Sequence, residues 1–403
     1  MHLRELELDE FRSFRSLRLP VEPAGFRAIG RNASGKSTLL EAIAMLATTR
    51  SPRTSSEREI ANWQSGKDLA VPPYARLRGA FERIDGAHEI EIRLTLDAAG
   101  NGPLRKQARL DDRPVRAVDA VGQFKTVLFG PEDVDLIAGP PSSRRRYLDI
   151  AISQGSRDYL RSLSRYARVL EQRNSLLRVF SREGVGSASK RPAQELPFWN
   201  AELAAAAADV LASRIGVANY LSDRASAHFA ALTGDESLAV AYSSSKIQLP
   251  SHLPSFTDWR SPPTETRQAL AVAVANALDA HSGEEFRRGV TAAGPHRDDL
   301  QITAHGVALG RFGSRGQQRL AVIAIKLAEF DLLEDAAGEP PTLLLDDVLS
   351  ELDAIHRQKL ISVLAERRAQ ICVTATDMSD LDSPALAHLP LVTIRHGSVA
   401  PGG

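Results

Sequence analysis

The sequence predicts an α/β fold in which a mixed β-sheet with helices is interrupted by a mostly helical second domain. Three observations predict it. Residues 30–37 read Gly-Arg-Asn-Ala-Ser-Gly-Lys-Ser and lie between a short apolar run and a helical apolar pattern. The apolar run 342–345 ends in two carboxylates, Asp346 and Asp347. The block between these islands, about 145–285, carries helical spacing, so we expect a discontinuous α/β domain with a helical insertion.

The composition bounds the class of protein without deciding its partner. The chain has 403 residues, of which 43% are hydrophobic and 25% charged, as in an ordinary globular protein of two domains. Fifty basic and fifty acidic residues cancel, so net charge neither supports nor excludes a nucleic-acid partner. The single cysteine, Cys372, favours a reducing, cytoplasmic compartment. No apolar run approaches the roughly 20 residues that cross a bilayer, so no membrane partner is expected.

The N-terminal elements come in the order that a phosphate-binding loop needs. The first 29 residues predict two strands, one at Leu3, Leu6 and Leu8 and the other over 26–29. Residues 37–47 then carry the apolar spacing of a helix. Strand, glycine-bearing loop and helix are the context of a P-loop.

The middle of the chain predicts hairpins followed by helices. Residues 76–129 alternate apolar and polar side chains, and glycines at 86, 100 and 102 predict antiparallel hairpins. Helices are expected at 143–182, 199–231 and 264–280, with a loop at 183–197 and a surface connection at 243–265.

From residue 290 onward the α/β pattern returns. Strands are predicted at 300–303, 342–345 and 370–374, and helices at 316–333 and 356–365. The predicted domains are an N-terminal lobe of the head over 1–144, a helical insertion over 145–288 and a C-terminal lobe over 289–403.

The string at residues 30–37 fits the P-loop pattern G-x-x-x-x-G-K-[ST]. Its glycines let backbone N–H groups face triphosphate oxygens, and the following helix N-terminus adds positive potential. Lys36 is expected to reach the β- and γ-phosphates, and Ser37 to bind Mg²⁺. A chance match in an ordinary loop is the alternative. The predicted nucleotide-binding residues are Gly30, Arg31, Asn32, Ala33, Ser34, Gly35, Lys36, Ser37 and Thr38.

The adjacent carboxylates predict the second half of a nucleotide site. Two carboxylates at the end of a buried strand are costly unless a cation or partner lies beside them. Asp346 is the expected Mg²⁺ ligand, through water, and Asp347 is placed to orient or deprotonate the attacking water. With Lys36 they form the predicted catalytic set. The alternative is a capping pair at a strand-to-helix turn.

A second anion site is predicted at Ser314, Gly316 and Gln317, where a serine hydroxyl and a glycine N–H open a helix. Within one chain this helix start has no obvious ligand, because the P-loop already holds the triphosphate. In a head-to-tail dimer it would cap the γ-phosphate of the other copy. A plain helix cap is the alternative interpretation.

Together with other motifs, these pieces resemble the RecF family of bacterial recombination-mediator ATPases, whose heads are related to those of structural-maintenance-of-chromosomes proteins. The match runs through nearly the whole chain. The further matching motifs lie at residues 10–14, 130–133, 139–149, 172–177, 294–300 and 350–353.

The resemblance implies an ATP-binding-cassette-type head that binds ATP and Mg²⁺ and has a weak, DNA-stimulated ATPase activity. It implies an ATP-dependent homodimer on DNA that helps to load a recombinase at single-strand gaps, with partners of the RecR and RecO type. It places Arg12 near the nucleotide, Ser314, Gly316 and Gln317 across the dimer, and Asp353 in a loop that crosses the interface. Such a protein would act in DNA replication and repair and be nucleoid-associated.

Two residues bear on how well this chain performs that role. The family loop has a glycine where Ala33 stands, and an alanine held at positive φ adds strain of roughly 1 kcal/mol. ATP affinity is the property that this departure affects. Asp347 is shorter than the glutamate of transporter-type cassettes, and we expect its shorter reach to keep turnover slow.

An arginine-rich stretch predicts contact with DNA phosphates. Nine arginines lie between residues 144 and 178, and several share one helical face. Duplex backbone binding without sequence readout is the expected mode. A solvated helix face is the alternative. The predicted DNA-binding residues are Arg144, Arg145, Arg146, Arg157, Arg161 and Arg165.

Other functions are weighed against this one. A head that tethers DNA, as in structural-maintenance-of-chromosomes proteins, needs a long heptad arm, and the insertion is too short for one. A transporter ATPase would carry other residues where Arg315 and Asp347 stand. An ATP-gated DNA clamp that does not hydrolyse ATP stays open as an alternative.

Overall fold

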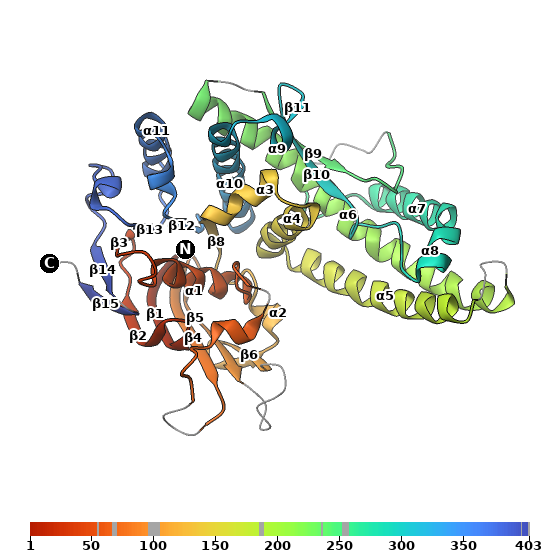
Figure 1. Cartoon of the computed structure of the whole chain (residues 1–403), viewed down its shortest axis with the longest axis horizontal. Coiled ribbons are helices and arrows are strands. Elements are labelled where there is room, and N and C mark those ends of the chain that lie inside the picture. The colour runs from red at the N-terminus through yellow and green to blue at the C-terminus, as the bar shows by residue number, and fades with distance from the viewer. Residues whose placement is uncertain are drawn as a thin grey trace. The chain divides into compact units, whose positions relative to one another are not determined.

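The computed structural model describes residues 1–54, 56–66, 71–95, 105–184, 189–234, 237–251, 258–395 and 397–401 (Figure 1). The chain divides into two compact units. The first comprises Met1–Val134, His228–Asp235 and Val322–Gly403, and the second Asp135–Ala227 and Glu236–Ala321. These limits differ from the domain boundaries expected after residues 144 and 288, because residues 135–144 and 289–321 group with the helices.

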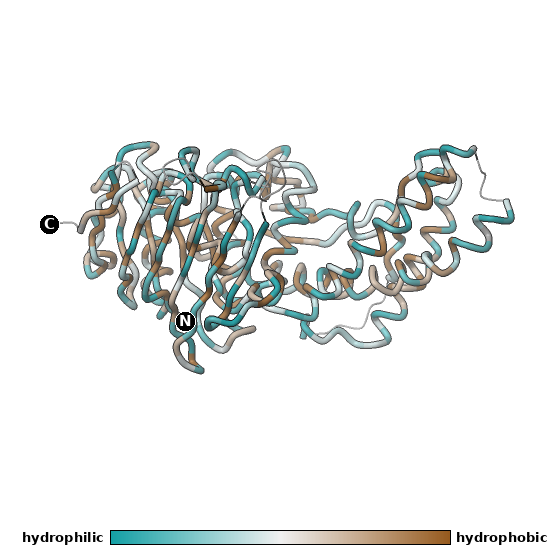
Figure 2. Tube along the Cα trace, turned by 90° about the horizontal axis from the view of Figure 1, so that it is seen from below, coloured by the Kyte–Doolittle hydropathy of each residue, from teal (hydrophilic) through white to brown (hydrophobic). Residues whose placement is uncertain are grey.

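The first unit contains an antiparallel sheet of six strands in the order β2-β1-β4-β5-β6-β7. Leu6 and Leu8 follow the alternation of a strand, but Leu3 reaches the same buried face only because the register shifts between Leu3 and Glu5. The alternation of hydrophobic and hydrophilic residues along strands is visible in Figure 2. The strands are β1 His2–Phe11, β2 Phe14–Pro20, β4 Tyr74–Arg83, β5 Gly86–Thr95, β6 Arg105–Leu110 and β7 Arg113–Val115.

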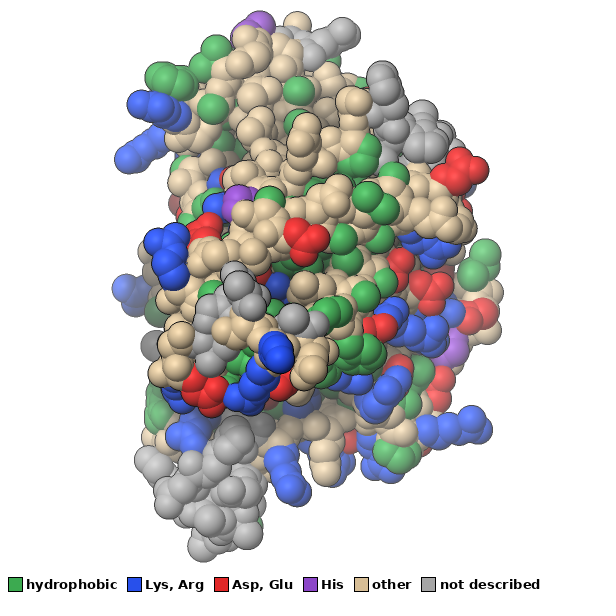
Figure 3. All heavy atoms as spheres, turned by 90° about the vertical axis from the view of Figure 1, so that its right-hand side faces the viewer, with side chains coloured by type: hydrophobic (Ala, Val, Ile, Leu, Met, Phe, Trp, Pro, Cys, Tyr) green, Lys and Arg blue, Asp and Glu red, His purple; other side chains and the backbone are tan. Residues whose placement is uncertain are grey.

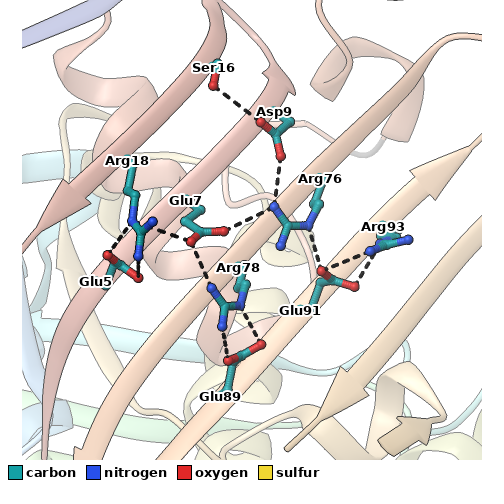
Figure 4. Close-up of polar contacts among 10 residues, drawn as sticks. All are labelled: Glu5, Glu7, Asp9, Ser16, Arg18, Arg76, Arg78, Glu89, Glu91 and Arg93. Carbon is teal, nitrogen blue, oxygen red and sulfur yellow. Dashed lines mark hydrogen bonds and ion pairs between the residues drawn. The ribbon is translucent and has the colours of Figure 1, made fainter. Parts of the chain in front are cut away.

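The polar face of this sheet carries a ladder of ion pairs across neighbouring strands (Figure 4). The Arg76 guanidinium lies 2.6 Å from the Glu91 carboxylate and 2.9 Å from that of Asp9. Arg78 pairs with Glu7 at 2.8 Å and also with Glu89. Cross-strand pairs of opposite charge stabilise a sheet modestly. Here they give the charged side chains of the polar face partners, while the other face packs into the core.

The second sheet of this unit has the order β15-β14-β3-β13-β12-β8 and is parallel except for β15. Strands β12 and β13 are buried along their whole length, as their continuous apolar runs predict. Because the strands are parallel, their carboxyl ends meet at one edge of the sheet. The strands are β3 Gly25–Ile29, β8 Thr126–Phe129, β12 Thr342–Asp346, β13 Ile371–Ala375, β14 Leu391–Arg395 and β15 Ser398–Pro401.

Helix α1 (Lys36–Thr48) packs against both sheets, and its buried face shares one hydrophobic core with them. A buried side chain also links the sheets: Gln370 accepts a hydrogen bond from the Leu3 backbone N–H and donates one to the Leu3 carbonyl, both at 2.7 Å. The remaining short elements of the unit are η1 Glu57–Ile60, α2 Ala117–Ala120, η2 Pro131–Val134, η3 Val348–Glu351, α11 Ala354–Ala365 and η4 Met378–Leu381.

The second unit is mostly helical and includes a three-stranded sheet in the order β11-β10-β9. Helix α5 packs against α4 and α8, and the buried pair Arg173–Glu285, at 2.6 Å, lies among these helices. Helices α6 and α10 have residues in both units. The elements are α3 Asp135–Ala138, α4 Pro141–Gly155, α5 Arg157–Arg182, α6 Lys190–Thr233, β9 Leu238–Ser243, α7 Thr264–Ala280, α8 Ser282–Arg288, β10 Asp299–Ala304, β11 Val307–Ala308, α9 Leu309–Phe312 and α10 Arg315–Ala337.

Several local predictions are wrong. The loop expected at 183–197 is wrong from residue 190 onward, because α6 begins at Lys190 and continues through Pro197. Residues 185–188 lie outside the described residues. Strand β8 was expected in a hairpin but pairs in parallel with β12. The sequence analysis predicts no strand at the positions of β2, β9, β11, β14 and β15. Of the glycines expected in hairpin turns, Gly86 is the first residue of β5, directly after the turn from β4, whereas positions 100 and 102 lie outside the described residues.

Candidate active site

The P-loop connects β3 to α1 at the carboxyl edge of the parallel sheet. Gly35 has φ 114°, and a side chain there would meet the Ser13 hydroxyl at 3.1 Å and the Phe14 ring at 3.2 Å. A Cβ at Gly30 would lie 2.4 Å from the Ser34 hydroxyl oxygen. Both glycines are therefore required by the path of the loop and by the close packing around it.

Ala33 has φ 61°, in the left-handed region, where an alanine adds strain. The residue is exposed, as are Arg31 and Asn32 beside it. The loop is held by backbone bonds from Ser34 N–H to the Arg31 carbonyl and from Gly397 N–H to the Ser34 carbonyl, both 3.1 Å. The chain's own contacts thus hold an alanine in the left-handed region, where L-residues are strained.

Lys36 is buried, and its ammonium group lies among polar atoms from three segments. It donates to the Gly30 carbonyl at 3.0 Å and to the Thr376 hydroxyl at 3.4 Å. The Asp347 carboxylate lies 3.7 Å away. Thr376 in turn donates to the Asn32 side-chain oxygen at 3.2 Å, so the P-loop is tied to the end of β13.

Ser37 and Asp346 meet as the sequence predicts. The Ser37 hydroxyl donates to Asp346 Oδ1 at 2.9 Å, although the two residues are far apart in the chain. The buried Thr374 hydroxyl lies 3.0 Å from the same oxygen. Thr38 follows Ser37 in α1 and is half-buried. The site therefore offers a hydroxyl and a carboxylate, which are oxygen donors of the kind that Mg²⁺ binds.

Asp347 follows directly and has a strained backbone, with φ 53°. Its N–H donates to the Thr374 hydroxyl at 3.1 Å. Burial raises the pKa of the Asp347 carboxyl, against the opposing charge of Lys36. Among the described residues its Oδ1 atom is buried without a hydrogen-bond partner, and so are the hydroxyls of Ser13 and Ser34. Buried polar atoms usually have a partner, so a bound water or ligand would satisfy these three.

Arg12 lies in the same unit, but its guanidinium is engaged by a buried glutamate. It forms two hydrogen bonds to the Glu41 carboxylate, at 2.7 and 3.1 Å, and one to the Glu59 carbonyl at 2.8 Å. Arg12 also has positive φ, 52°, and its carbonyl accepts from Asn62. The expected nucleotide contact of Arg12 stays a prediction, and its described partner is Glu41.

The Ser314 segment belongs to the second unit and forms a reciprocal cap at the start of α10. The Gln317 N–H donates to the Ser314 hydroxyl at 3.2 Å, and the Ser314 N–H donates to the Gln317 side chain at 2.9 Å. This is a capping box, as in the plain-cap alternative. Ser314, Gly316 and Gln317 are exposed, however, and a Cβ at Gly316 would meet only the Ser314 hydroxyl, at 4.0 Å. Nothing described within the chain requires glycine there.

Asp353 begins α11 as its N-cap. Its side chain accepts from the N–H groups of Ile355 and His356, both at 3.0 Å. These hydrogen bonds from His356 and Ile355, together with the His356 ring, lower the pKa of the exposed Asp353 carboxyl. Ile355 is an exposed large apolar residue beside it.

Most of the predicted DNA-binding arginines are engaged within the second unit. Arg144 makes a two-pronged ion pair with Asp299, at 2.7 and 2.9 Å, and Arg145 donates to a backbone carbonyl at 2.7 Å. Arg161 pairs with Asp158 and Arg165 with Glu202; Arg146 also has a partner, whereas Arg157 is exposed. Figure 3 shows basic side chains interspersed with acidic ones. Arg144, Arg161 and Arg165 each have an acidic partner within the chain, which lowers the free positive charge that they could offer to DNA.

The motif at residues 294–299 proves to be the centre of a buried polar network. The His296 Nδ1 atom lies 2.5 Å from the Tyr166 hydroxyl, and its Nε2 atom 3.3 Å from the Thr291 carbonyl. Burial lowers the pKa of His296 to about 4. Arg214 donates to the Pro295 carbonyl at 2.7 Å. These contacts assign the motif a structural role that sequence reasoning could not give it.

A family model described as the RecF/RecN/SMC N terminal domain matches residues 2–384. The DNA replication and repair protein RecF of Thermomicrobium roseum is 42% identical over 403 residues, which cover 100% of both chains. The chain belongs to the RecF family. The RecF protein of Chloroflexus aurantiacus is 41% identical over 407 residues, again covering 100% of both chains.

Solved structures agree with the RecF assignment. One described as the recombination mediator protein RecF-ATP in the RecFOR pathway has a TM-score of 0.83 and 28% identity, covering 100% of this chain and 98% of that chain. A structural-maintenance-of-chromosomes head bound to the winged-helix domain of ScpA has a TM-score of 0.50 and 15% identity over 100% and 98%, which shows the fold alone. The predicted head fold with a helical insertion is confirmed. No described helix is long and apolar enough to span a membrane.

Proposed function

We propose that the chain binds ATP with Mg²⁺, dimerises with ATP on DNA, and slowly hydrolyses the nucleotide while helping a recombinase to load at single-strand gaps. The observation that carries the proposal is the convergence of Lys36, Ser37, Asp346 and Asp347 at one sheet edge. Membership of the RecF family supports the DNA-repair part, since relatives carry that description. Mediators of the RecR and RecO type are the expected partners.

The residues present fit ATP and Mg²⁺. Lys36 and the N-terminus of α1 would hold phosphate oxygens, and Ser37 and Asp346 would hold the metal. The described residues include no group of three or more His, Cys, Asp or Glu side chains placed to bind a metal, so water and phosphate oxygens would complete the coordination. When bound, Mg²⁺ neutralises charge on the phosphates and makes the γ-phosphate a better target for water.

Asp347 is the proposed group that orients and accepts a proton from the attacking water. Its pKa is raised by burial, which makes the carboxylate a better base than an exposed aspartate. The Lys36 ammonium, 3.7 Å away, keeps the carboxylate from being neutralised. Lys36 would thus act on both the phosphates and the base.

The Ser314 loop supports the dimer. Gly316 is the second residue of α10, and no described contact within the chain requires a glycine there. A second molecule that packs closely against the start of α10 would leave no room for a side chain at Gly316. An exposed helix N-terminus also suits a phosphate. We assign that phosphate to the nucleotide of a second copy of the chain, with Asp353 and Ile355 near the same interface.

Sedimentation with nucleotide and duplex DNA tests the proposal. The wild-type chain should double in mass when ATP, Mg²⁺ and duplex DNA are all present. Asp347→Asn should still dimerise but lose ATP hydrolysis, whereas Asp382→Asn, an exposed aspartate of the same unit, should behave as wild type. A chain that dimerises equally well without nucleotide, or stays monomeric with all three present, would contradict the proposal. Dimerisation without any turnover would favour the ATP-gated clamp.

A further inference from the structure

Thr374 is a fully buried hydroxyl residue at the end of β13, opposite Asp346 of β12 in the parallel register. Its neighbours along the strand are apolar and buried, so the hydroxyl must find its partners at the strand ends. Three atoms lie within hydrogen-bonding reach. They are Asp346 Oδ1 at 3.0 Å, the Asp347 backbone N at 3.1 Å and the Leu345 carbonyl at 3.4 Å.

The hydrogen count decides how these contacts are shared. A hydroxyl donates one hydrogen and accepts through two lone pairs. The Asp347 N–H can only donate, so the Thr374 oxygen accepts from it. The single hydroxyl hydrogen then goes to Asp346 Oδ1, which is both nearer than the Leu345 carbonyl and charged. One hydroxyl therefore joins the side chain of Asp346 to the backbone of Asp347.

Both hydrogen bonds of Thr374 restrain aspartates of the site: one holds the Asp346 side chain and the other holds the Asp347 backbone. Asp346 Oδ1 is held from one side by Ser37 and from the other by Thr374. Asp347 has φ 53°, a conformation that an L-residue keeps only where its surroundings hold it. The bond from its N–H to Thr374 is part of that support. Loss of the hydroxyl would remove one support from the Asp346 side chain and one from the Asp347 backbone at once.

We propose that Thr374 is a positioning residue that fixes Asp346, the metal-binding carboxylate, relative to Asp347, the water-orienting carboxylate. The inference rests on the proposed Mg²⁺-ATP function. The P-loop groups that hold phosphate do not depend on Thr374, whose hydrogen-bond partners among the described residues all lie at 345–347. Removing the hydroxyl should therefore leave metal-free ATP binding unchanged. It should reduce the Mg²⁺ gain, which is the factor by which ATP binds more tightly in Mg²⁺ than in EDTA, and it should slow hydrolysis.

The test compares ATP affinity in EDTA with that in Mg²⁺ by calorimetry, together with kcat and KM. Thr374→Val removes the hydroxyl at constant shape, and Thr374→Ser retains it. Thr342→Val is the matched control, because Thr342 is equally buried on β12 but its hydroxyl bonds Gln370 at the far end of the strand. For Thr374→Val we expect metal-free affinity within about twofold of wild type, and a loss of about 10–100-fold in kcat and in the Mg²⁺ gain.

Thr374→Ser should recover most of both losses, and Thr342→Val should show neither. If Thr374→Val does not fold, Thr374→Ala removes the same hydroxyl with less volume, and the same comparison applies. An unchanged Mg²⁺ gain and kcat without the hydroxyl, an equal loss in Thr342→Val, or no rescue by serine would overturn the positioning role. A wild-type chain whose ATP affinity does not respond to Mg²⁺ would instead contradict the proposed function on which it rests.

Discussion

Replacing Ala33 by glycine tests how the P-loop holds its shape. Ala33 is exposed and has φ 61°, so its methyl group adds strain without contributing appreciable burial. The left-handed conformation costs a non-glycine residue about 1–2 kcal/mol. Glycine also gains freedom in the unfolded chain, which costs about 0.4–1 kcal/mol. The difference predicts that Ala33→Gly raises the free energy of unfolding by roughly 0.5–1 kcal/mol.

Chemical denaturation measures this change, and Ala387→Gly is the matched control. Ala387 is an exposed turn alanine of the same unit whose φ is not positive, so it should be destabilised by about 0.4–1 kcal/mol. Because bonds within the chain hold the loop, the strain belongs to folding, and ATP affinity should change by less than about twofold. The reasoning is refuted if both variants lose stability equally. It is also refuted if Ala33→Gly binds ATP fivefold more tightly, which would place about 1 kcal/mol of strain in binding.

Three further predictions concern the surroundings of the site. Gln370→Met should lower the free energy of unfolding by about 3 kcal/mol in denaturation experiments, because the buried Leu3 N–H and carbonyl lose their partners; a change below 1 kcal/mol would show that the strands rearrange. The pKa of His296 is about 4 in the folded chain, so the unfolded chain takes up a proton first and stability should fall by up to about 3 kcal/mol as pH drops from about 6.5 to 4. His296→Asn should flatten that dependence in pH-resolved denaturation, and an equally steep variant would contradict it. Arg144→Ala should lower the free energy of unfolding by about 2 kcal/mol, because the ion pair with Asp299 is lost. In fluorescence titrations the salt dependence of DNA binding should stay unchanged. A weaker salt dependence in the variant would show that Arg144 contacts DNA phosphates.

The parts of the site that the sequence could predict are those that a short stretch of residues specifies by itself. The P-loop stands between an apolar strand and an apolar helix, and Asp346–Asp347 end a strand of continuous apolar residues. Parallel strands bring such ends to one edge, so the contact between Ser37 and Asp346 follows from fold class alone. The family loop has a glycine where Ala33 stands, and the structure shows that this position does require a positive φ.

The parts that the sequence could not predict depend on pairing between distant segments. The hydrogen-bond partners of Thr374 depend on the register of β13 against β12, which the sequence alone does not show. Arg12 was expected near the nucleotide, but Glu41, which reads as an ordinary helix residue, engages it. The glycine, serine, lysine and proline residues of 183–197 are typical of a loop, although α6 begins at Lys190 and includes Pro197. Local propensity was overridden there by packing.

The central claim is that two copies of the chain each complete the other's nucleotide site. Mixing two inactive variants tests it most directly: Lys36→Ala damages the P-loop, and Ser314→Arg damages the segment that starts α10. If the site is shared, a mixed dimer has one site in which both parts are intact, and an equimolar mixture should recover roughly a quarter of the wild-type ATPase rate. If both parts serve the nucleotide of their own chain, the mixture will be as inactive as either variant alone, and the account of a shared site is wrong.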